Sequence, residues 1–222
     1  CAHLLAEIPA ARLFDEFLKL FLAGSAAKTL DNLLEYDLLR YLFPGTSKCI
    51  QQDDKVLTLV QAAMGNTDER IAEGKHVTPA FILAALLWPI VSKQFEALES
   101  SGEAPMVAMH SAAHSAITEA VKHISIPRRF SQPMREIWEF QLRLQRRTGR
   151  KAVELIEHRR FRAAYDFLLL REQAGEDTGE LGSWWTEIQE LPPEQRLEKA
   201  ASMEDNHKRP KRIRKRRPNP AP

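Results

Sequence analysis

Apolar residues recur at intervals of three and four along most of this chain, the spacing that places them on one face of a helix. In residues 9–24, Leu13, Phe14 and Phe17 fall on one face and the charged side chains fall opposite. No run of alternating apolar and polar residues predicts a strand. We therefore expect an all-α fold. The predicted helices span 9–24, 28–43, 53–65, 78–89, 104–126 and 133–148, with two short helices within 149–171 and further short ones within 183–201.

Proline and glycine set the expected ends of these helices. Pro9 suits a first turn and Gly24 suits a stop. Gly65 is expected to end the third helix, and Pro89 to end or kink the fourth. The fourth helix carries the longest apolar run, PAFILAALLWPIV, which is shorter than the roughly 20 residues that a bilayer requires. We expect a buried helix there and no transmembrane segment.

Charge is distributed unevenly, although the net charge of the 222 residues is only +2. Residues 128–162 hold eleven Arg or Lys against four Glu, and residues 208–217 hold eight basic residues and no acidic one. Residues 172–205 carry ten acidic residues against two basic ones. This separation indicates a polyanionic partner for the basic parts.

A basic helix face is predicted between residues 143 and 150. Arg143, Arg146, Arg147 and Arg150 follow the spacing i, i+3, i+4, i+7, which brings them together if the helix is continuous. Guanidinium groups can donate two hydrogen bonds to one phosphate, so a nucleic-acid interface and a self-paired solvated surface are the two interpretations. The candidate nucleic-acid-binding residues are Arg128, Arg129, Arg143, Arg146, Arg147, Arg150, Lys151, Arg159, Arg160, Arg162, Lys208, Arg209, Lys211, Arg212, Arg214, Lys215, Arg216 and Arg217.

The last segment, residues 204–222, is polar, proline-rich and basic, and its composition predicts disorder. Each phosphate that such a tail neutralises releases counterions, so its binding would depend on salt and not on sequence. RNA, DNA and acidic lipid all offer this chemistry, and a tail that serves only solubility is the alternative.

Metal-binding and thiol chemistry have little support in the chain. His110 and His114 have the spacing of a zinc-binding helix, but the glutamate of the full signature is missing and no third ligand is indicated. Cys1 and Cys49 form neither a metal-ligand spacing nor a disulfide framework, which favours a reduced, cytoplasmic protein. We predict no metal ligand.

A second pattern resembles a catalytic site. Gly24 and Ser25 are followed by Glu35 and Asp37, as in nucleotidyltransferases, where two carboxylates bind the Mg²⁺ ions of phosphoryl transfer. That chemistry requires both carboxylates on one side of a strand. Within a leucine-rich helix, residues i and i+2 point about 200° apart. We therefore predict no catalytic residue in this chain.

Four ordered blocks resemble the C-terminal portion of bacterial poly(A) polymerases, which share the nucleotidyltransferase superfamily with tRNA CCA-adding enzymes. The last block favours poly(A) polymerase over a CCA-adding enzyme, and the tryptophan pair at 184–185 and the arginine-rich C-terminus also fit. The blocks are IPAARLFDEFLKLF, LLEYDLLRYLFP, NTDERIAEGKHVTPAFILAALLW and IPRRFSQPMREIWEFQLRLQRRTGRKAVELIEHRRFRAAYDFLLLR.

The resemblance implies part of an enzyme that transfers adenylate from ATP to RNA 3′ ends in mRNA processing and decay. It implies that ATP and Mg²⁺ are bound mainly by a catalytic head outside this chain, which would bind no cofactor and be inactive alone. Because the chain begins with Cys1, we expect a piece of a longer protein or a processed chain, and of the two we favour a missing N-terminal region. The eighteen candidates would then form an RNA track, with RNA 3′ ends as the partner.

The same resemblance implies a division of the chain into four parts. Residues 1–45 would end the neck and start the helical body, 46–171 would form the RNA-binding body, 172–203 an acidic linker with short helices, and 204–222 the disordered tail. Two alternatives stay open. One is a scaffold that docks proteins of the RNA-decay machinery, and the other is a fragment of a CCA-adding tRNA nucleotidyltransferase.

Overall fold

The structure, a computed structural model, describes residues 2–203, and every regular element in that range is helical. The predicted all-α fold is confirmed, while the predicted disordered tail lies outside the described residues. The chain starts with the 3-10 helix η1 (Ala2–Glu7). The α-helices are α1 (Ala10–Phe21), α2 (Ala26–Glu35), α3 (Leu39–Leu42), α4 (Pro44–Gln52), α5 (Asp54–Ala72), α6 (Pro79–Ser100), α7 (Pro105–Ala120), α8 (Arg128–Leu144), α9 (Gly149–Ile156), α10 (Phe161–Gln173), α11 (Leu181–Glu190) and α12 (Pro193–Ser202).

Helix α6 is the centre of the larger of two hydrophobic clusters. Its residues from Ala80 to Pro89 are all buried, as its apolar run predicts. The helix does not end at Pro89 but continues to Ser100, because one missing N–H is offset by the packing of α7 and α8 along it. Its 22 residues are long and apolar enough to cross a bilayer, but 56% of the apolar window is buried inside the fold, as in the core helix of a globular domain.

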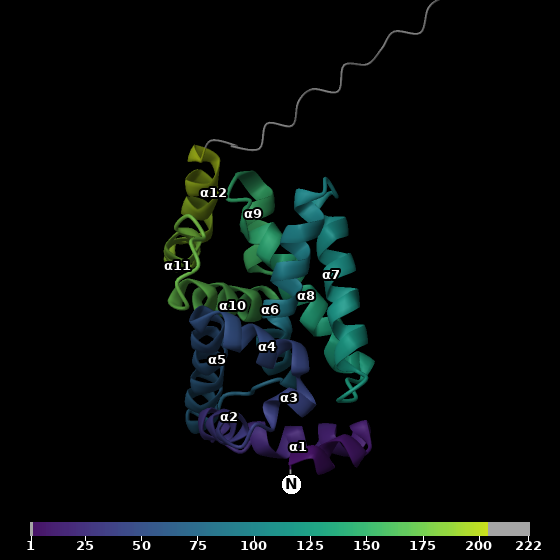
Figure 1. The fold of residues 1–222 in the computed structure, drawn as a ribbon. Coiled ribbons are helices and arrows are strands. Elements are labelled where there is room, and N and C mark those ends of the chain that lie inside the picture. Colours follow the sequence, from purple (N-terminus) through teal and green to yellow (C-terminus); the bar gives the residue numbers. More distant parts are fainter. Residues whose placement is uncertain (1, 204–222) are drawn as a thin grey trace, which may run out of the picture.

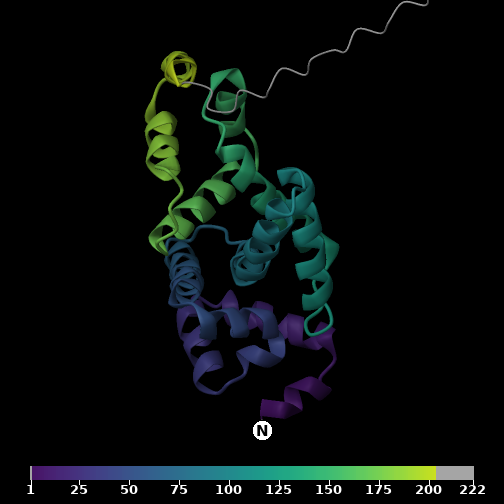
Figure 2. The same ribbon diagram turned by 45° about the horizontal axis from the view of Figure 1, so that its top comes forward.

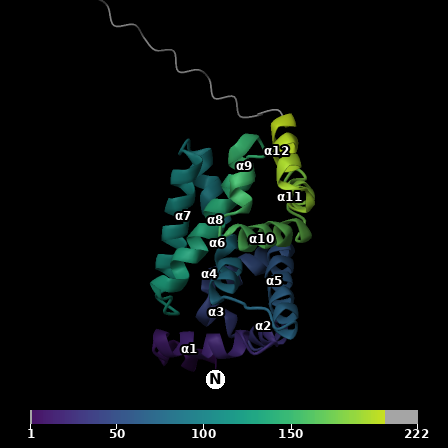
Figure 3. The ribbon, with the colours of Figure 1, turned by 180° about the vertical axis from the view of Figure 1, so that it is seen from behind.

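The two clusters share helices α8 and α10. The first cluster takes Met134 and Trp138 from α8, and the second takes Phe140 and Leu144 from the following turns. Figure 1 shows α1 at one end of the molecule and α9 and α12 at the other, with α10 crossing between. The view turned by 45° keeps this order, and the view from behind shows α9 between α12 and α7. The segment 128–162 therefore starts beside α1, where Phe130 packs on Phe14, and runs to the opposite end, where α9 lies (Figures 2 and 3).

The predicted helix over 28–43 is wrong in one respect, because it is broken in the middle. Asp37 has a φ of 55°, in the left-handed region, and lies just beyond the end of α2. The amide of Leu38 donates to the carbonyl of Leu33 at 2.8 Å, and the amide of Asp37 donates to that of Leu34 at 3.1 Å. This is a Schellman ending, which satisfies the last carbonyls of α2. The leucines on both sides kept the apolar period continuous and hid the break.

Two other helix ends also differ from the prediction. Helix α5 passes through Gly65 and ends beside Gly74, whose φ is 69° and whose amide donates to Ile71 at 3.0 Å. Helix α8 begins five residues before Pro133 and ends at Leu144, not at 148. Glycine and proline are tolerated within a helix at a moderate cost, so their presence alone does not locate its end.

Candidate nucleic-acid interface

The predicted basic face between residues 143 and 150 does not lie on one helix. Arg143 is in the last turn of α8, Arg146 and Arg147 are in the following turn, and Arg150 is in α9. Gly149, with a φ of 67°, starts the new helix. The prediction of one continuous face is therefore wrong, and the side chains must be placed one at a time.

A buried tryptophan holds the end of α8. Trp185 of α11 is fully buried, and its Nε1 donates to the carbonyl of Leu144 at 2.9 Å. This bond satisfies one of the carbonyls that a helix leaves free at its C-terminus. The amide of Arg146 then donates to the carbonyl of Arg143 at 3.0 Å, which tightens the turn. Trp185 and Leu144 both belong to the second hydrophobic cluster. The turn that carries Arg146 and Arg147, which we call the basic turn, is thus fixed to that cluster.

Three of the predicted cations line one groove. Arg143, Arg146 and Lys151 surround a hollow of about 580 Å³ between the end of α6, the start of α7, the end of α8 and α9. Glu99 is the only acidic residue among those that line it. Within residues 2–203, no hydrogen bond or ion pair engages the side chain of Arg146 or Lys151. The groove therefore presents cationic groups that are available to an anion.

Arg143 is partly engaged at the edge of this groove. Its guanidinium lies 5.1 Å from the centroid of the Phe140 ring, and its Nη2 is 3.7 Å from Oε2 of Glu139. Glu139 also pairs with Nε2 of His110 at 3.0 Å. The described residues contain no group of three side chains that could hold a metal ion, so His110 faces a carboxylate here and not a metal site.

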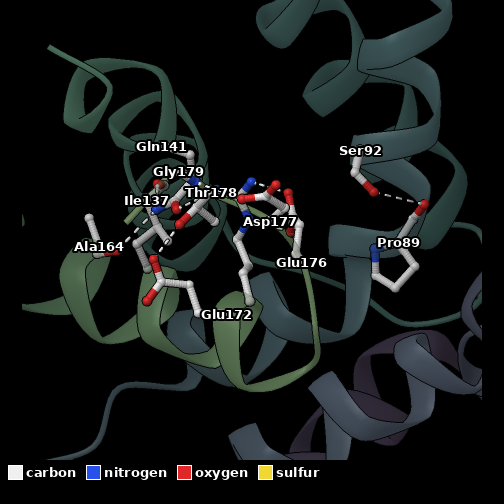
Figure 4. A network of polar contacts seen from close by, with 11 residues as sticks. Pro89, Ser92, Ile137, Gln141, Ala164, Glu172, Glu176, Asp177, Thr178 and Gly179 are labelled. Atoms are coloured by element: carbon white, nitrogen blue, oxygen red, sulfur yellow. Dashed lines mark hydrogen bonds and ion pairs between the residues drawn. The ribbon is translucent and has the colours of Figure 1, made fainter. Parts of the chain in front are cut away.

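Arg147 faces away from the groove and toward the loop between α10 and α11. Its Nη1 donates to the carbonyl of Gly179 at 3.3 Å. Figure 4 shows Thr178 and Glu172 pointing toward each other in this region, and Glu172 also accepts from the amide of Gly182 at 2.8 Å. Beside them Gln141 donates to the carbonyls of Ile137 and Ala164, both at 3.1 Å (Figure 4). Arg147 therefore contacts the acidic loop between α10 and α11 and not the groove.

Two further predicted cations are held by Glu136 of α8. Nε of Arg160 lies 2.5 Å from Oε2 of Glu136, and Nη2 of Arg159 lies 3.4 Å from Oε1. Burial acts to raise the pKa of Glu136, but the hydrogen bond and charge of Arg160, with smaller help from Gln132 and Arg159, leave that pKa below its ordinary value. These two arginines fasten the turn before α10 to α8.

Arg162 is held by Asp166, one turn further along α10. The two side chains form a bidentate pair, with distances of 2.8 Å and 3.1 Å. Burial raises the pKa of Asp166 above its ordinary value, and the charges of Arg162 and Arg70 offset only part of that effect. Arg150 also has a carboxylate, Glu154, at 2.9 Å, but both side chains are largely exposed.

The remaining predicted cations lie away from the groove or outside the described residues. Arg128 and Arg129 are at the start of α8, about 22 Å along the helix axis from Arg143. The guanidinium of Arg129 lies 4.9 Å from the centroid of the Phe130 ring. The candidates outside the described residues are Lys208, Arg209, Lys211, Arg212, Arg214, Lys215, Arg216 and Arg217.

Arg135 was not among the cations predicted to bind nucleic acid. It precedes the groove residue Leu142 by seven positions on α8, which puts both on the same side of the helix. Burial lowers the pKa of Arg135, and the negative charge of Glu139 offsets part of that effect. No hydrogen bond or ion pair engages its side chain in the described part of the chain. A partly desolvated cation without a partner would gain from an anion beside it.

The second hollow, of about 350 Å³, has the opposite character. Both of its cations are already engaged, since Lys55 donates to the carbonyl of Gly175 at 3.2 Å and Arg171 pairs with Glu176. Its lining also contains Asp53, Glu96 and Asp177. An acidic lining repels phosphate, so this hollow is not a candidate for the same ligand.

The carboxylates that resemble a Mg²⁺ site do not form one. Glu35 ends α2, and Asp37 lies beyond it and pairs with Arg40 at 2.9 Å. The expectation that both lie within one helix is wrong, since α2 ends between them. In the described residues no further carboxylate completes the set, so these residues do not fit the Mg²⁺ ions of phosphoryl transfer.

Comparison with known proteins connects this geometry to a family. Residues 101–219 match the family described as "Polymerase A arginine-rich C-terminus", and residues 1–50 match "Probable RNA and SrmB- binding site of polymerase A". All the residues that line the groove except Glu99 lie within the first match. The second match covers η1 to α3 and most of α4, where the sequence analysis placed no site.

Curated relatives agree with these matches. The chain is 39% identical to Poly(A) polymerase I of Salmonella typhi, over 88% of this chain and 43% of the relative. It is 37% identical to the enzyme of that name from Escherichia coli O157:H7, over 98% and 48%, and 36% identical to that of Haemophilus influenzae, over 95% and 48%. The chain thus spans about half the length of the curated relatives it matches. Because the arginine-rich family model covers more than half of the chain, this chain belongs to the polymerase A family.

Proposed function

We propose that this chain is the RNA-binding part of a polymerase that adds adenylate from ATP to RNA 3′ ends. The observation that carries the proposal is the groove of Arg143, Arg146 and Lys151, in which two cations have no partner in the described residues. An untemplated polymerase must hold RNA of varying sequence. Contacts to phosphates do this, because they position a strand without specifying its bases.

The chemistry of the whole enzyme would be divided between this chain and the rest of the protein. ATP and Mg²⁺ would be bound mainly outside it, because the described residues offer no set of carboxylates that fits the metal. The chain would act in the cytoplasm, in mRNA processing and decay. We also propose its division into the end of the neck with the start of the helical body (1–45), the RNA-binding body (46–171), an acidic linker with short helices (172–203) and a basic tail (204–222).

Charge reversal at the groove tests this proposal. Arg146→Glu with Lys151→Glu should weaken the binding of a fluorescent single-stranded oligo(A) by about tenfold or more, since a hydrogen bond to a charged group is worth roughly 1.5–3 kcal/mol. The matched control is Lys75→Glu with Lys122→Glu, which changes the net charge equally at two exposed lysines outside the groove. Equal losses for the two pairs would refute a specific role of the groove.

A second function, protein docking, is favoured at residues 1–50. The description of the matching family names SrmB beside RNA, and Leu4, Leu20 and Tyr36 are exposed large apolar side chains in this range. We propose that Leu20 and Tyr36 contribute to such a surface. Leu20→Glu with Tyr36→Ser should abolish recovery of SrmB in a pull-down treated with RNase, and retention at the wild-type level would exclude this surface.

A further inference from the structure

The groove has a feature that phosphate binding alone does not require. Besides its cations it is lined by Pro105, Met106, Leu142 and Leu155, an apolar set that we call the apolar floor. Met106 is 36% exposed. Exposed aliphatic surface next to cations suits a ligand with an anionic part and an apolar part side by side. A nucleotide with its base removed from the stack has both parts.

The size of the groove fits such a ligand. A volume of about 580 Å³ is within the range of roughly 300–1,000 Å³ that is typical of small-ligand sites. A duplex would present phosphates, sugars and base edges but no free base face, because its bases are stacked and paired. A single strand can turn one base into the hollow while its phosphates stay on the cationic edge. The apolar floor therefore favours single-stranded over double-stranded RNA.

We propose that the groove takes an unstacked base of single-stranded RNA against Met106 and Leu142, with the adjoining phosphates on Arg146 and Lys151. This inference rests on the proposed function and adds the class of RNA that the site selects. None of the residues that line the groove is aromatic. The base is thus held by aliphatic and thioether contacts, which adapt to different bases.

The polar groups of the lining add a preference among bases. Glu99 and Gln145 also line the groove. A glutamate accepts from an exocyclic amino group, and a glutamine can pair with the amino edge of adenine. Uracil has no exocyclic amino group, and its one donor on that edge, N3–H, lies between two carbonyl oxygens that a carboxylate repels. The groove should accept adenine in preference to uracil.

A polar substitution at Met106 tests the apolar floor, and the same substitution at the neighbouring Val107 serves as the control. Met106→Gln keeps the length and charge of the side chain but removes its apolar character. It should weaken the binding of single-stranded oligo(A) about three- to tenfold. Binding of an RNA duplex of equal length should not change. Val107→Gln is the matched control, because Val107 is exposed on the same helical turn and does not line the groove. It should change neither affinity.

The base preference is tested by Glu99→Gln, which should bring the ratio of oligo(A) to oligo(U) affinity closer to one.

If Met106→Gln and Glu99→Gln bind all RNAs like the wild type while the Arg146 and Lys151 double variant does not, base insertion is overturned and phosphate binding stands. If the double variant also binds like the wild type, both proposals fail. Thermal unfolding of each variant checks that the fold is kept.

Discussion

The groove and the surroundings of the carboxylates Glu136 and Asp166 both contain arginines, but their cations differ in what they contact. Arg146 and Lys151 line an open groove and have no partner in the described residues. Arg160 and Arg162 are held by carboxylates whose side chains are only 17% and 10% exposed. The density of arginine along the sequence is therefore a poor guide to the cations that remain available for a ligand.

The paired cations have a structural role instead. Glu136 ties the turn before α10 to α8, and Asp166 engages both Arg162 of α10 and Arg70 of α5. These contacts join the helices that carry the two hydrophobic clusters. They hold the frame on which α9 and the basic turn are placed. Their loss should change stability, while loss of the groove cations should change RNA binding.

The largest expected effect concerns the tryptophan that holds the basic turn. Trp185→Ala should lower the free energy of unfolding by about 3–5 kcal/mol, because it removes a fully buried indole from the second cluster. Trp185→Phe keeps most of the packing and loses the bond to Leu144, at a cost of about 1 kcal/mol from the lost bond. Urea unfolding measures both. A loss below 1 kcal/mol for the alanine variant would contradict this packing.

The next effect separates stability from RNA binding. Glu136→Gln should destabilise the fold by roughly 1.5–3 kcal/mol, since it weakens a charged hydrogen bond to Arg160. Oligo(A) affinity should stay within about twofold at a temperature where the variant is folded, because the groove lining does not include Glu136. A variant that keeps its stability and loses RNA affinity would reverse the assignment of roles.

The two carboxylates should respond to acid in opposite directions. The pKa of Glu136 is lowered in the folded state, so its stabilising contribution is complete above its unfolded pKa and is lost as the pH falls through the folded pKa. The pKa of Asp166 is raised, so the folded state binds its proton more tightly and its contribution to stability increases as the pH falls.

Urea unfolding between pH 6 and pH 3 measures this difference. Relative to the wild type, Glu136→Gln should lose less stability on acidification, and Asp166→Asn should lose more. Both comparisons hold the other carboxylates of the chain constant. Parallel pH profiles for all three proteins would show that neither carboxylate titrates differently in the folded and unfolded states.

The smallest effect is expected at the exposed pair of α9. Arg150→Gln removes an ion pair in which the side chains of Arg150 and Glu154 are 85% and 56% exposed. Such pairs contribute about 0.3–0.5 kcal/mol, because water and salt screen them. In thermal unfolding, the midpoint temperature should shift by an amount close to the error of the measurement. A shift as large as that of Glu136→Gln would mean that exposure does not distinguish these pairs.

The fold class was predictable because helical periodicity survives in the core-facing residues, as in Leu13, Phe14 and Phe17 of α1. The ends of the helices were not predictable from the sequence, because contacts with residues far along the chain determine some of them. The carbonyl of Leu144 is satisfied by Trp185, 41 residues later, and no local pattern around Leu144 indicates that bond. Continuity of the helix through Arg150 was the assumption that failed.

The site was predictable as a region and not as a set of side chains. The excess of arginine in residues 128–162 led to the segment that contains the groove, but pairing with Glu136 and Asp166 depends on how α8 and α10 cross. Arg135 was overlooked because its neighbours in the sequence are not basic. Met106 and Glu99 were overlooked because α6 and α7 reach the groove only through tertiary packing.

The salt dependence of RNA affinity tests the central claim most directly. Two variants each remove two positive charges: Arg146→Gln with Lys151→Gln at the groove, and Arg159→Gln with Arg162→Gln among the paired cations. The slope of log affinity against log salt should become shallower by about 1.4 for the groove variant, since each phosphate contact on a single strand contributes roughly 0.7. The slope of the other variant should equal that of the wild type. Equal changes in both would contradict the account, because net charge alone would then set the affinity.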